Sequence, residues 1–268
     1  MRKKILRSLA NQIEYELQKK KDVDVKLSEN MRSVRDFKTS DPLLKRLVDC
    51  YWQQGRESQS QLLQDLFALT VSDQKRNGFF VEFGATNGIT LSNTHLLEKS
   101  FSWTGILAEP ARGWHERLSQ ARPGSKIIHD CVWKESGAKL NFRETDEGEL
   151  SSIVEYVGSD GHKKSRDRGY QEYEVTSISL NDLLGRCEAP HEIDFISIDT
   201  EGSEFEILNA FDFSNYRFNA MAVEHNFSEN EERINQLLEA HYYKRVLKEM
   251  SAWDAWYVHQ DRYDEIMK

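Results

Sequence analysis

Three carboxylates follow one another closely after the apolar stretch 193–198, at Asp199, Glu201 and Glu204. Acidic side chains in the first turn of a helix are a common favourable arrangement, which explains Glu204 without any function. Asp199 and Glu201 instead fall where the apolar stretch ends, and carboxylates there can accept a proton or position a substrate. Three carboxylates could also bind a divalent cation through oxygen. Their spacing does not require one, so we predict no metal ligands.

A histidine lies at the end of another predicted strand. His225 follows the apolar run 220–223 and Glu224. Imidazole titrates near neutral pH, so His225 is our first candidate for a general base, with Asp199 and Glu201 as the alternative pair. A structural histidine in a supporting role is the competing interpretation.

A glycine turn contains a second group of candidate residues. The run 79–83, Phe-Phe-Val-Glu-Phe, predicts a strand that is covered on both faces, as in a parallel sheet. The turn 84–88, Gly-Ala-Thr-Asn-Gly, allows close approach of a ligand before a helix whose first N–H groups are unpaired. We therefore expect a nucleotide-like cofactor there, although a tight connection without a ligand would use the same residues. Glu82 is a carboxylate inside the apolar strand, which is costly unless a cationic ligand or donors in the next loop pair with it.

Polar residues also follow the next two predicted strands. Glu109 comes after the strand predicted at 101–107, about twenty residues beyond Gly88, where nucleotide-binding folds place an acid on the ribose hydroxyls. A short strand at 126–128 precedes a polar group that could face an adenine edge: His129, Asp130 and Cys131. Ordinary packing is the alternative for His129 and Cys131.

The elements that must position these residues alternate along the chain. Apolar runs alternate with helical periodicity and end in two successive strands, 242–248 and 255–258, which predicts a mostly parallel α/β sheet with an antiparallel edge. The polar loop 144–173 is typical of a lid or substrate loop, and a surface excursion is the alternative.

The first part of the chain has a different character. Residues 1–38 are highly charged, with apolar residues at four-residue spacing, which predicts an amphipathic helix. Two more helices are predicted, over 42–51 and 59–69. We therefore divide the chain into an N-terminal helical extension, 1–72, for packing or self-association, and a main domain, 73–268.

Composition restricts the class of protein. The chain has 268 residues, a net charge of −9 and three widely spaced cysteines. No apolar run reaches the length of a membrane span, and the basic N-terminus does not resemble a secretory signal. The cysteines suit a reducing compartment and neither a disulfide framework nor a zinc site. We expect a cytoplasmic protein that acts on a small or neutral acceptor and does not bind nucleic acid.

Several motifs, in order along the chain, resemble those of the FkbM family of S-adenosylmethionine-dependent methyltransferases. They are Val-Glu-Phe-Gly-Ala-Thr-Asn-Gly at 81–88, Ile-Leu-Ala-Glu-Pro at 106–110, Ile-Asp-Thr-Glu-Gly-Ser-Glu-Phe-Glu-Ile-Leu at 198–208 and Val-Glu-His-Asn at 223–226. The resemblance implies a Rossmann-like class I methyltransferase fold, a seven-stranded sheet with a reversed final hairpin and helices on both faces. It also implies methylation of an acceptor oxygen, often on a sugar, polysaccharide or secondary metabolite.

The resemblance also implies roles for individual residues. Glu82 and the glycine turn would hold the methionine and ribose parts of S-adenosylmethionine, Glu109 the ribose hydroxyls, and Asp199 the region of the methionine amino group and the acceptor. Asp130 and Cys131 would flank the adenine. The turn residues concerned are Gly84, Ala85, Thr86, Asn87 and Gly88.

Three other classes fit the sequence less well. A dinucleotide-dependent oxidoreductase would carry Gly-x-Gly-x-x-Gly where this chain has Gly-x-x-x-Gly. A nucleic-acid amino-methyltransferase would carry an Asp or Asn followed by two prolines and an aromatic residue after the fourth strand, and the acidic charge is unfavourable for it. A non-catalytic scaffold on the same fold is the remaining alternative.

Overall fold

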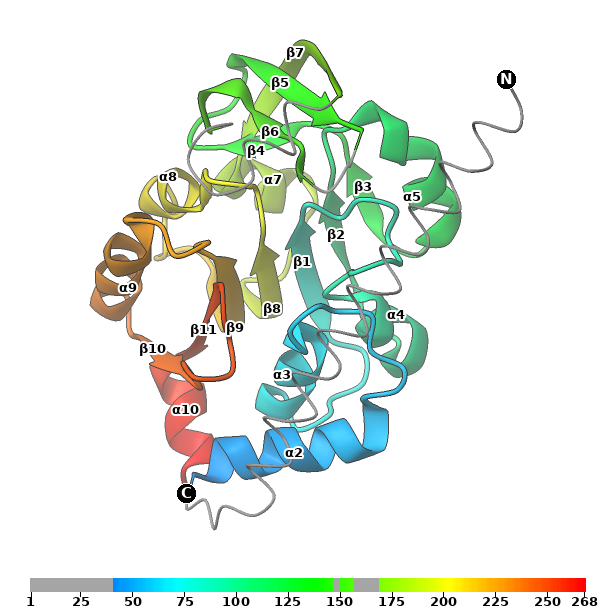
Figure 1. Ribbon diagram of the computed structural model, residues 1–268. Helices are drawn as coiled ribbons and strands as arrows, with labels where there is room; N and C mark the ends of the chain where they lie inside the picture. The colour runs from blue at the N-terminus through cyan, green and yellow to red at the C-terminus, as the bar shows by residue number, and fades with distance from the viewer. Residues whose placement is uncertain (1–40, 147–149, 157–168) are drawn as a thin grey trace.

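A seven-stranded sheet forms the centre of the molecule. The computed structural model describes residues 41–146, 150–156 and 169–268. The strand order is β10-β11-β9-β8-β1-β2-β3 (Figure 1). Strands β3, β2, β1, β8 and β9 pair in parallel, whereas β11 runs antiparallel to both β9 and β10. The predicted sheet with a reversed final hairpin is confirmed.

The strands of this sheet are β1 (Phe79–Phe83), β2 (Thr104–Ala108), β3 (Lys126–Ile128), β8 (Glu192–Ile198), β9 (Arg217–Glu224), β10 (Tyr243–Val246) and β11 (Asp254–His259). The helices are α2 (Pro42–Gln54), α3 (Gln64–Val71), α4 (His95–Phe101), α5 (His115–Ala121), α7 (Leu180–Arg186), α8 (Glu204–Asn209), α9 (Asn230–Ala240) and α10 (Gln260–Ile266), with short 3₁₀ turns η1 (Arg112–Trp114) and η3 (Val154–Tyr156).

Helices cover both faces of this sheet. Along β1, Phe80 packs with α2, α3, α4 and α10, whereas Val81 and Phe83 pack with α7, α8 and α9. Successive side chains of a strand point to opposite faces, so a strand with two covered faces needs apolar residues at nearly every position. This explains the apolar character of 79–83, which only Glu82 interrupts, and places the two cores on opposite sides of the sheet.

The described part of the predicted N-terminal extension packs on the sheet. Asp41 caps α2 by accepting from the N–H groups of Leu43 and Leu44. All eight residues of α3 are buried, and Phe67 stacks on Trp256 of β11 with ring centroids 4.7 Å apart. Helix α3 thus forms part of the core of the main domain. The amphipathic helix predicted within residues 1–38 lies outside the described residues.

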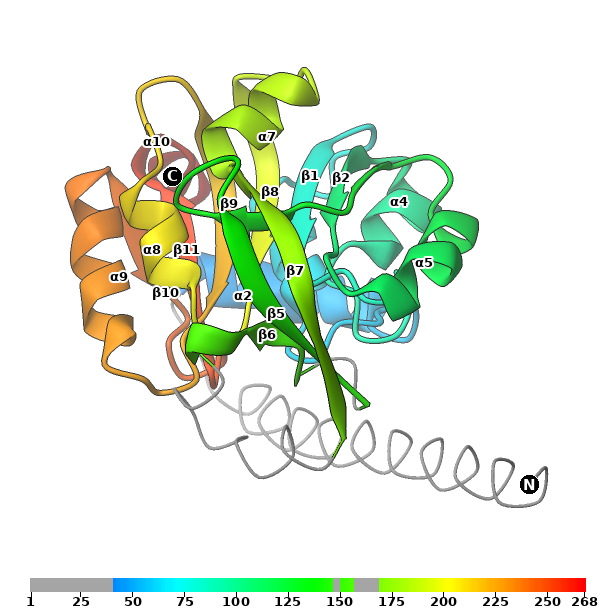
Figure 2. The ribbon, with the colours of Figure 1, turned by 90° about the horizontal axis from the view of Figure 1, so that it is seen from above.

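A second, smaller sheet covers the end of the first. It has the order β4-β7-β5-β6, formed by β4 (Cys131–Trp133), β5 (Lys139–Thr145), β6 (Ser152–Ile153) and β7 (Tyr170–Ser179). In Figure 1 it lies beyond the tip of β1, and from above in Figure 2 β5 and β7 cross over the large sheet. The segment 144–173, predicted as a lid, contributes β6 and parts of β5 and β7 to this cover.

None of the helices in residues 41–146, 150–156 and 169–268 has the length and apolar character needed to cross a membrane.

Candidate functional site

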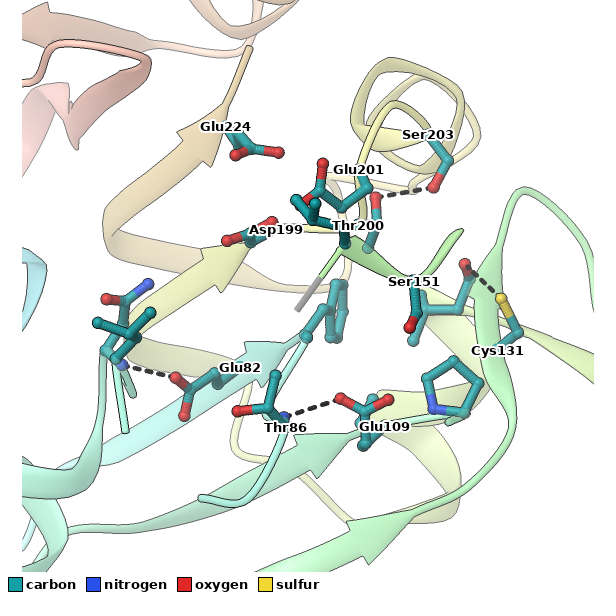
Figure 3. Close-up of a pocket in the computed structure, with 18 of the residues that line it drawn as sticks. Glu82, Thr86, Glu109, Cys131, Ser151, Asp199, Thr200, Glu201, Ser203 and Glu224 are labelled. Atoms are coloured by element: carbon teal, nitrogen blue, oxygen red, sulfur yellow. Dashed lines mark hydrogen bonds between the residues drawn. The ribbon is translucent and has the colours of Figure 1, made fainter. Parts of the chain in front are cut away.

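A pocket lies between the carboxyl ends of the parallel strands and the small sheet. Residues at the ends of β1, β2, β8 and β9 line it, together with Phe142, Leu150 and Ile153 of the small sheet and its loop. Figure 3 shows the labelled carboxylates Glu82, Glu109, Asp199, Glu201 and Glu224 in this lining. Ligands of open α/β sheets bind at this edge. Among the described residues that line it, every charged side chain is a carboxylate: Glu82, Glu109, Asp199, Glu201 and Glu224.

The glycine turn divides into residues that face the pocket and residues that shape the turn. Gly84 and Thr86 line the pocket. Gly84 has a φ of +72°, and a Cβ there would lie 2.4 Å from the carbonyl oxygen of Asp199. The backbones of β1 and β8 therefore meet at a position that only glycine can occupy.

The other three turn residues support this conformation from outside the pocket lining. Ala85 is buried in the core. The side-chain oxygen of Asn87 accepts from the N–H groups of Ile89 and Thr90, which closes a local turn. Gly88 has a φ of +76°, and a Cβ there would lie 2.7 Å from side-chain carbon atoms of Leu118 and Arg122.

Glu109 is fixed at the pocket wall by two backbone groups. Its Oε2 accepts from Thr86 N at 2.8 Å and its Oε1 accepts from Ala111 N at 2.8 Å. Burial raises the pKa of Glu109 to about 7, although these hydrogen bonds favour the charged form. Each carboxylate oxygen can accept further bonds, so Glu109 can still bind hydroxyl groups of a ligand.

Glu82 is paired by the following loop. Its Oε1 accepts from Asn93 N at 2.6 Å, and its Oε2 accepts from the hydroxyl groups of Ser92 and Thr94. Burial raises its pKa, and the charge of Arg122 opposes this effect. Donors in the next loop, one of the two predicted solutions, therefore stabilise this buried carboxylate without a ligand.

Arg122 is a residue that the sequence analysis missed. Its side chain is completely buried, donates to Glu98 Oε2 at 2.7 Å and reaches the carbonyl oxygen of Gly88 at 3.1 Å. It also bonds the loop residues Ser92 and Thr94. Arg122 thus holds the glycine turn and the loop behind Glu82 together, a role that a lone arginine after a predicted helix does not reveal.

Asp199, Glu201 and Glu224 come together on the other side of the pocket. One carboxylate oxygen from each lies within 4.8 Å of the others. Ile198 of β8 pairs with Val223 of β9, so the residues that follow, Asp199 and Glu224, are neighbours at the sheet edge. Burial, followed by the charges of Asp254 and Glu204, raises the pKa of Asp199 to about 8. Burial and the neighbouring Asp199 charge also raise the pKa of Glu224.

His225 lies outside this pocket lining. Its Nε2 donates to the carbonyl oxygen of Asp254 at 2.9 Å, and its Nδ1 accepts from Phe227 N at 3.0 Å. The ring is 3% exposed, and burial lowers its pKa. Both ring nitrogens are used by the backbone, so this geometry does not support the predicted role of His225 as general base and favours the structural alternative.

The two residues predicted to flank adenine diverge. Cys131 lines the pocket, with a thiol whose pKa burial raises to about 12. Asp130 instead accepts from Arg186 at 2.6 Å and is not among the lining residues. Of this pair, the structure brings only Cys131 to the pocket.

Glu224 and Asn93 are among the lining residues that were not selected from the sequence. Glu224 directly precedes His225 in the sequence. The parallel pairing of β8 with β9 would have indicated Glu224, because residues that follow paired positions of parallel strands meet at one edge of the sheet. Asn93 donates to Ser197 Oγ at 2.9 Å, while its buried Oδ1 has no hydrogen-bond partner among the described residues. No local pattern in the sequence distinguishes Asn93 from other loop residues.

Comparison with protein-family models gives a match over most of the sheet. The model described as the methyltransferase FkbM domain matches residues 82–255, from β1 to β11. The chain belongs to this family. The FkbM match includes the pocket-lining carboxylates and excludes α2 and α3. A comparison with curated protein sequences gives no match.

Solved structures with similarity to this FkbM protein include two methyltransferase structures. Precorrin-6y C5,15-methyltransferase from Geobacter metallireducens has 9% sequence identity and a TM-score of 0.37, covering 72% of this chain and 85% of that one. A suspected sarcosine dimethylglycine methyltransferase from Galdieria sulphuraria has 10% identity and a TM-score of 0.36, covering 71% and 64% of the two chains. A similarity at this level says nothing about the substrate.

Proposed function

We propose that this FkbM protein binds S-adenosylmethionine in the pocket and transfers its methyl group to a hydroxyl oxygen of a sugar, polysaccharide or secondary-metabolite acceptor. The observation that carries the proposal is the pocket itself, which combines Glu109, held by Thr86 N and Ala111 N, with charged lining residues that are all acidic in the described part of the chain.

The residues of the pocket suit the chemistry of this cofactor. S-adenosylmethionine carries an ammonium and a sulfonium, and carboxylates attract both. Glu109 is assigned to the ribose hydroxyls, because it has acceptor capacity left after its two backbone bonds. The unpartnered Oδ1 of Asn93, together with Asp199, is assigned to the methionine ammonium. The bound cofactor supplies an activated methyl group on sulfur.

The chain's own part in the reaction is to position the acceptor and remove its proton. Holding two reactants in line supplies much of the acceleration in such a transfer. Asp199 and Glu201 lie at the acceptor side of the pocket and are assigned to the hydroxyl, whose proton must leave as the new bond forms. A positioned base of this kind contributes ~10²–10⁴-fold.

The small sheet is assigned to acceptor selection. Phe142, Leu150 and Ile153 line the pocket from the small sheet and its loop. Their apolar side chains suit the carbon faces of a ring, whereas the hydroxyl would face the carboxylates. The proposal therefore assigns the specificity of the enzyme to Phe142, Leu150 and Ile153.

Transfer of a labelled methyl group tests this function. The purified chain is incubated with methyl-tritiated S-adenosylmethionine and fractions of sugar and secondary-metabolite acceptors, and label in alkali-stable ether linkages is counted. The proposal expects incorporation by the wild-type chain that is lost in Glu109→Leu. Label that appears only in amine or thiol acceptors would contradict oxygen methylation. Absence of cofactor binding by the folded chain would favour a non-catalytic scaffold.

A further inference from the structure

The three carboxylates at the ends of β8 and β9 form a feature that methyl transfer alone does not explain. Asp199, Glu201 and Glu224 each offer one oxygen within 4.8 Å of the other two. Glu201 has a left-handed backbone, with a φ of 59°, just before Gly202. The turn after β8 therefore carries Glu201 next to Glu224 of the neighbouring strand.

Glu224 provides an independent sign of a missing partner. The residue is 8% exposed, and its Oε2 is buried without a hydrogen-bond partner among the described residues. Figure 3 shows its carboxyl group directed towards the space that Asp199 and Glu201 border. A buried carboxylate oxygen without a partner is costly, so such a group in a binding pocket points to a ligand.

Side-chain cations are absent from the described part of the pocket lining. No lysine, arginine or histidine is among the described residues that line the pocket. The buried guanidinium of Arg122 lies behind Glu82, and Arg245 pairs with Glu231 outside the lining.

The separation of the oxygens suits a single ion. Mg²⁺ and Ca²⁺ hold oxygen ligands at about 2.0–2.6 Å, so two ligands of one ion lie at most about 4–5 Å apart. All three oxygens meet this limit. Carboxylate ligands without nitrogen or sulfur favour Mg²⁺, Ca²⁺ and Mn²⁺ over zinc or copper.

We propose that Asp199, Glu201 and Glu224 bind one hard divalent cation, of the Mg²⁺ or Mn²⁺ type, at the acceptor side of the pocket. The sequence analysis predicted no metal ligands, because the spacing of Asp199, Glu201 and Glu204 does not require one. Glu204 instead accepts from Thr200 N and Gly202 N at 2.9 and 3.0 Å, so it stabilises the turn that presents Glu201.

The cation would bind the hydroxyl acceptor of the proposed methyl transfer, and this role rests on the proposed function. Three carboxylates leave coordination positions open, and a hydroxyl oxygen of the acceptor takes one of them. Coordination to a divalent cation lowers the pKa of a hydroxyl and fixes its oxygen. Asp199 and Glu201 would then hold the acceptor through the ion, and a carboxylate oxygen of Asp199 or Glu201 that does not bind the ion would accept the proton of the hydroxyl. Acceptors with two adjacent oxygens would be favoured, because both can bind one cation.

Direct binding of Mn²⁺ tests the site without cofactor or acceptor. The full chain, freed of metal with a chelator and dialysed, is titrated with Mn²⁺ while the electron paramagnetic resonance signal of free Mn²⁺ is recorded. One site per chain is expected in the wild type, with competition by Mg²⁺. Glu224→Gln and Glu201→Gln should each weaken binding by at least about tenfold. Both variants preserve side-chain shape, and circular dichroism checks that they fold.

Glu206→Gln is the matched control. It removes one negative charge from α8, the helix that follows the site, but Glu206 faces Arg233 and does not line the pocket. Its Mn²⁺ affinity should stay within about twofold of wild type, since the charge of Glu206 is paired with Arg233. Absence of binding to folded wild-type chain at millimolar Mn²⁺, or equal binding by wild type and both site variants, would overturn the proposal.

Cofactor binding is measured separately in the presence of a chelator. If S-adenosylmethionine binds there and Mn²⁺ does not bind in its own titration, the metal site is wrong and the methyltransferase proposal stands. If Mn²⁺ binds and the cofactor does not, the metal site stands without the proposed reaction.

Discussion

Replacing Gly84 by alanine tests the contact between the glycine turn and the strand that carries the acidic site. The added Cβ would lie 2.4 Å from the carbonyl oxygen of Asp199, whereas ordinary contact begins near 3.4 Å. The two backbones must therefore separate by about 1 Å, and neither atom belongs to a flexible side chain that could move away. The end of β1 and the end of β8 would shift relative to each other, within the proposed cofactor site.

Two effects contribute to the loss of stability. A left-handed alanine costs roughly 1–2 kcal/mol, and relieving such a steric overlap adds about 1–3 kcal/mol. The free energy of unfolding should thus fall by roughly 2–5 kcal/mol. Gly137→Ala is the matched control: its φ is +82°, but nothing lies within 4 Å of its Cβ position. This variant keeps the backbone effect and lacks the overlap, and the change in unfolded-chain entropy is the same in both.

Chemical denaturation of the two variants gives the comparison directly. Gly84→Ala should be less stable than Gly137→Ala by about 1–3 kcal/mol, and calorimetry should show that it alone loses affinity for S-adenosylmethionine. Equal stability of the two variants, with cofactor binding retained by both, would refute the close approach of β1 and β8 as the reason for glycine at this position.

Three other changes test separate parts of the structure. Arg122→Met leaves Glu82 and Glu98 buried beside an uncharged side chain and should lower the free energy of unfolding by about 3–5 kcal/mol in denaturant titrations; a loss below about 1 kcal/mol would contradict its buried pairing. His225→Ala removes two bonds to the backbone and should lower the melting temperature while folded enzyme keeps its turnover; complete loss of turnover in stably folded enzyme would restore the base role predicted from sequence. Burial raises the pKa of Asp65 from 3.8 to about 6, so its contribution to stability is complete below 3.8 and is lost as pH rises through about 6. Asp65→Asn should remove that part of the pH dependence from unfolding curves, and identical pH profiles for variant and wild type would show that Asp65 titrates normally.

Much of the architecture could be predicted because each strand of the large sheet is marked by its own residues. The predicted strands 79–83 and 126–128 match β1 and β3. These segments are bounded by glycine, proline or strongly polar residues, which fix their ends locally. The small sheet was only partly predicted, since β6 is two residues long and its pairing with β5 is a tertiary contact.

In the candidate site, too, the residues marked by local signals could be predicted and those that depend on tertiary contacts could not. Gly84 and Glu109 follow from local signals, a glycine turn and an acid at a strand end, and both line the pocket. Glu224 was not selected, because the sequence does not show that its side chain lines the pocket while that of the neighbouring His225 does not. The direction of the His225 ring is fixed by its hydrogen bonds to the carbonyl oxygen of Asp254, in β11, and to the N–H group of Phe227, in the turn after β9. The sequence around His225 does not reveal these contacts.

Calorimetric titration with S-adenosylmethionine, and separately with its demethylated product, tests the central claim most directly. The wild-type chain should bind both at micromolar concentration, and Glu109→Leu should abolish binding of both because the ribose loses its carboxylate partner. Glu116→Leu, which changes an exposed residue of α5, should bind like wild type. Absence of heat from either ligand with folded wild-type chain, or equal binding by Glu109→Leu, would contradict the assignment of this pocket to the cofactor.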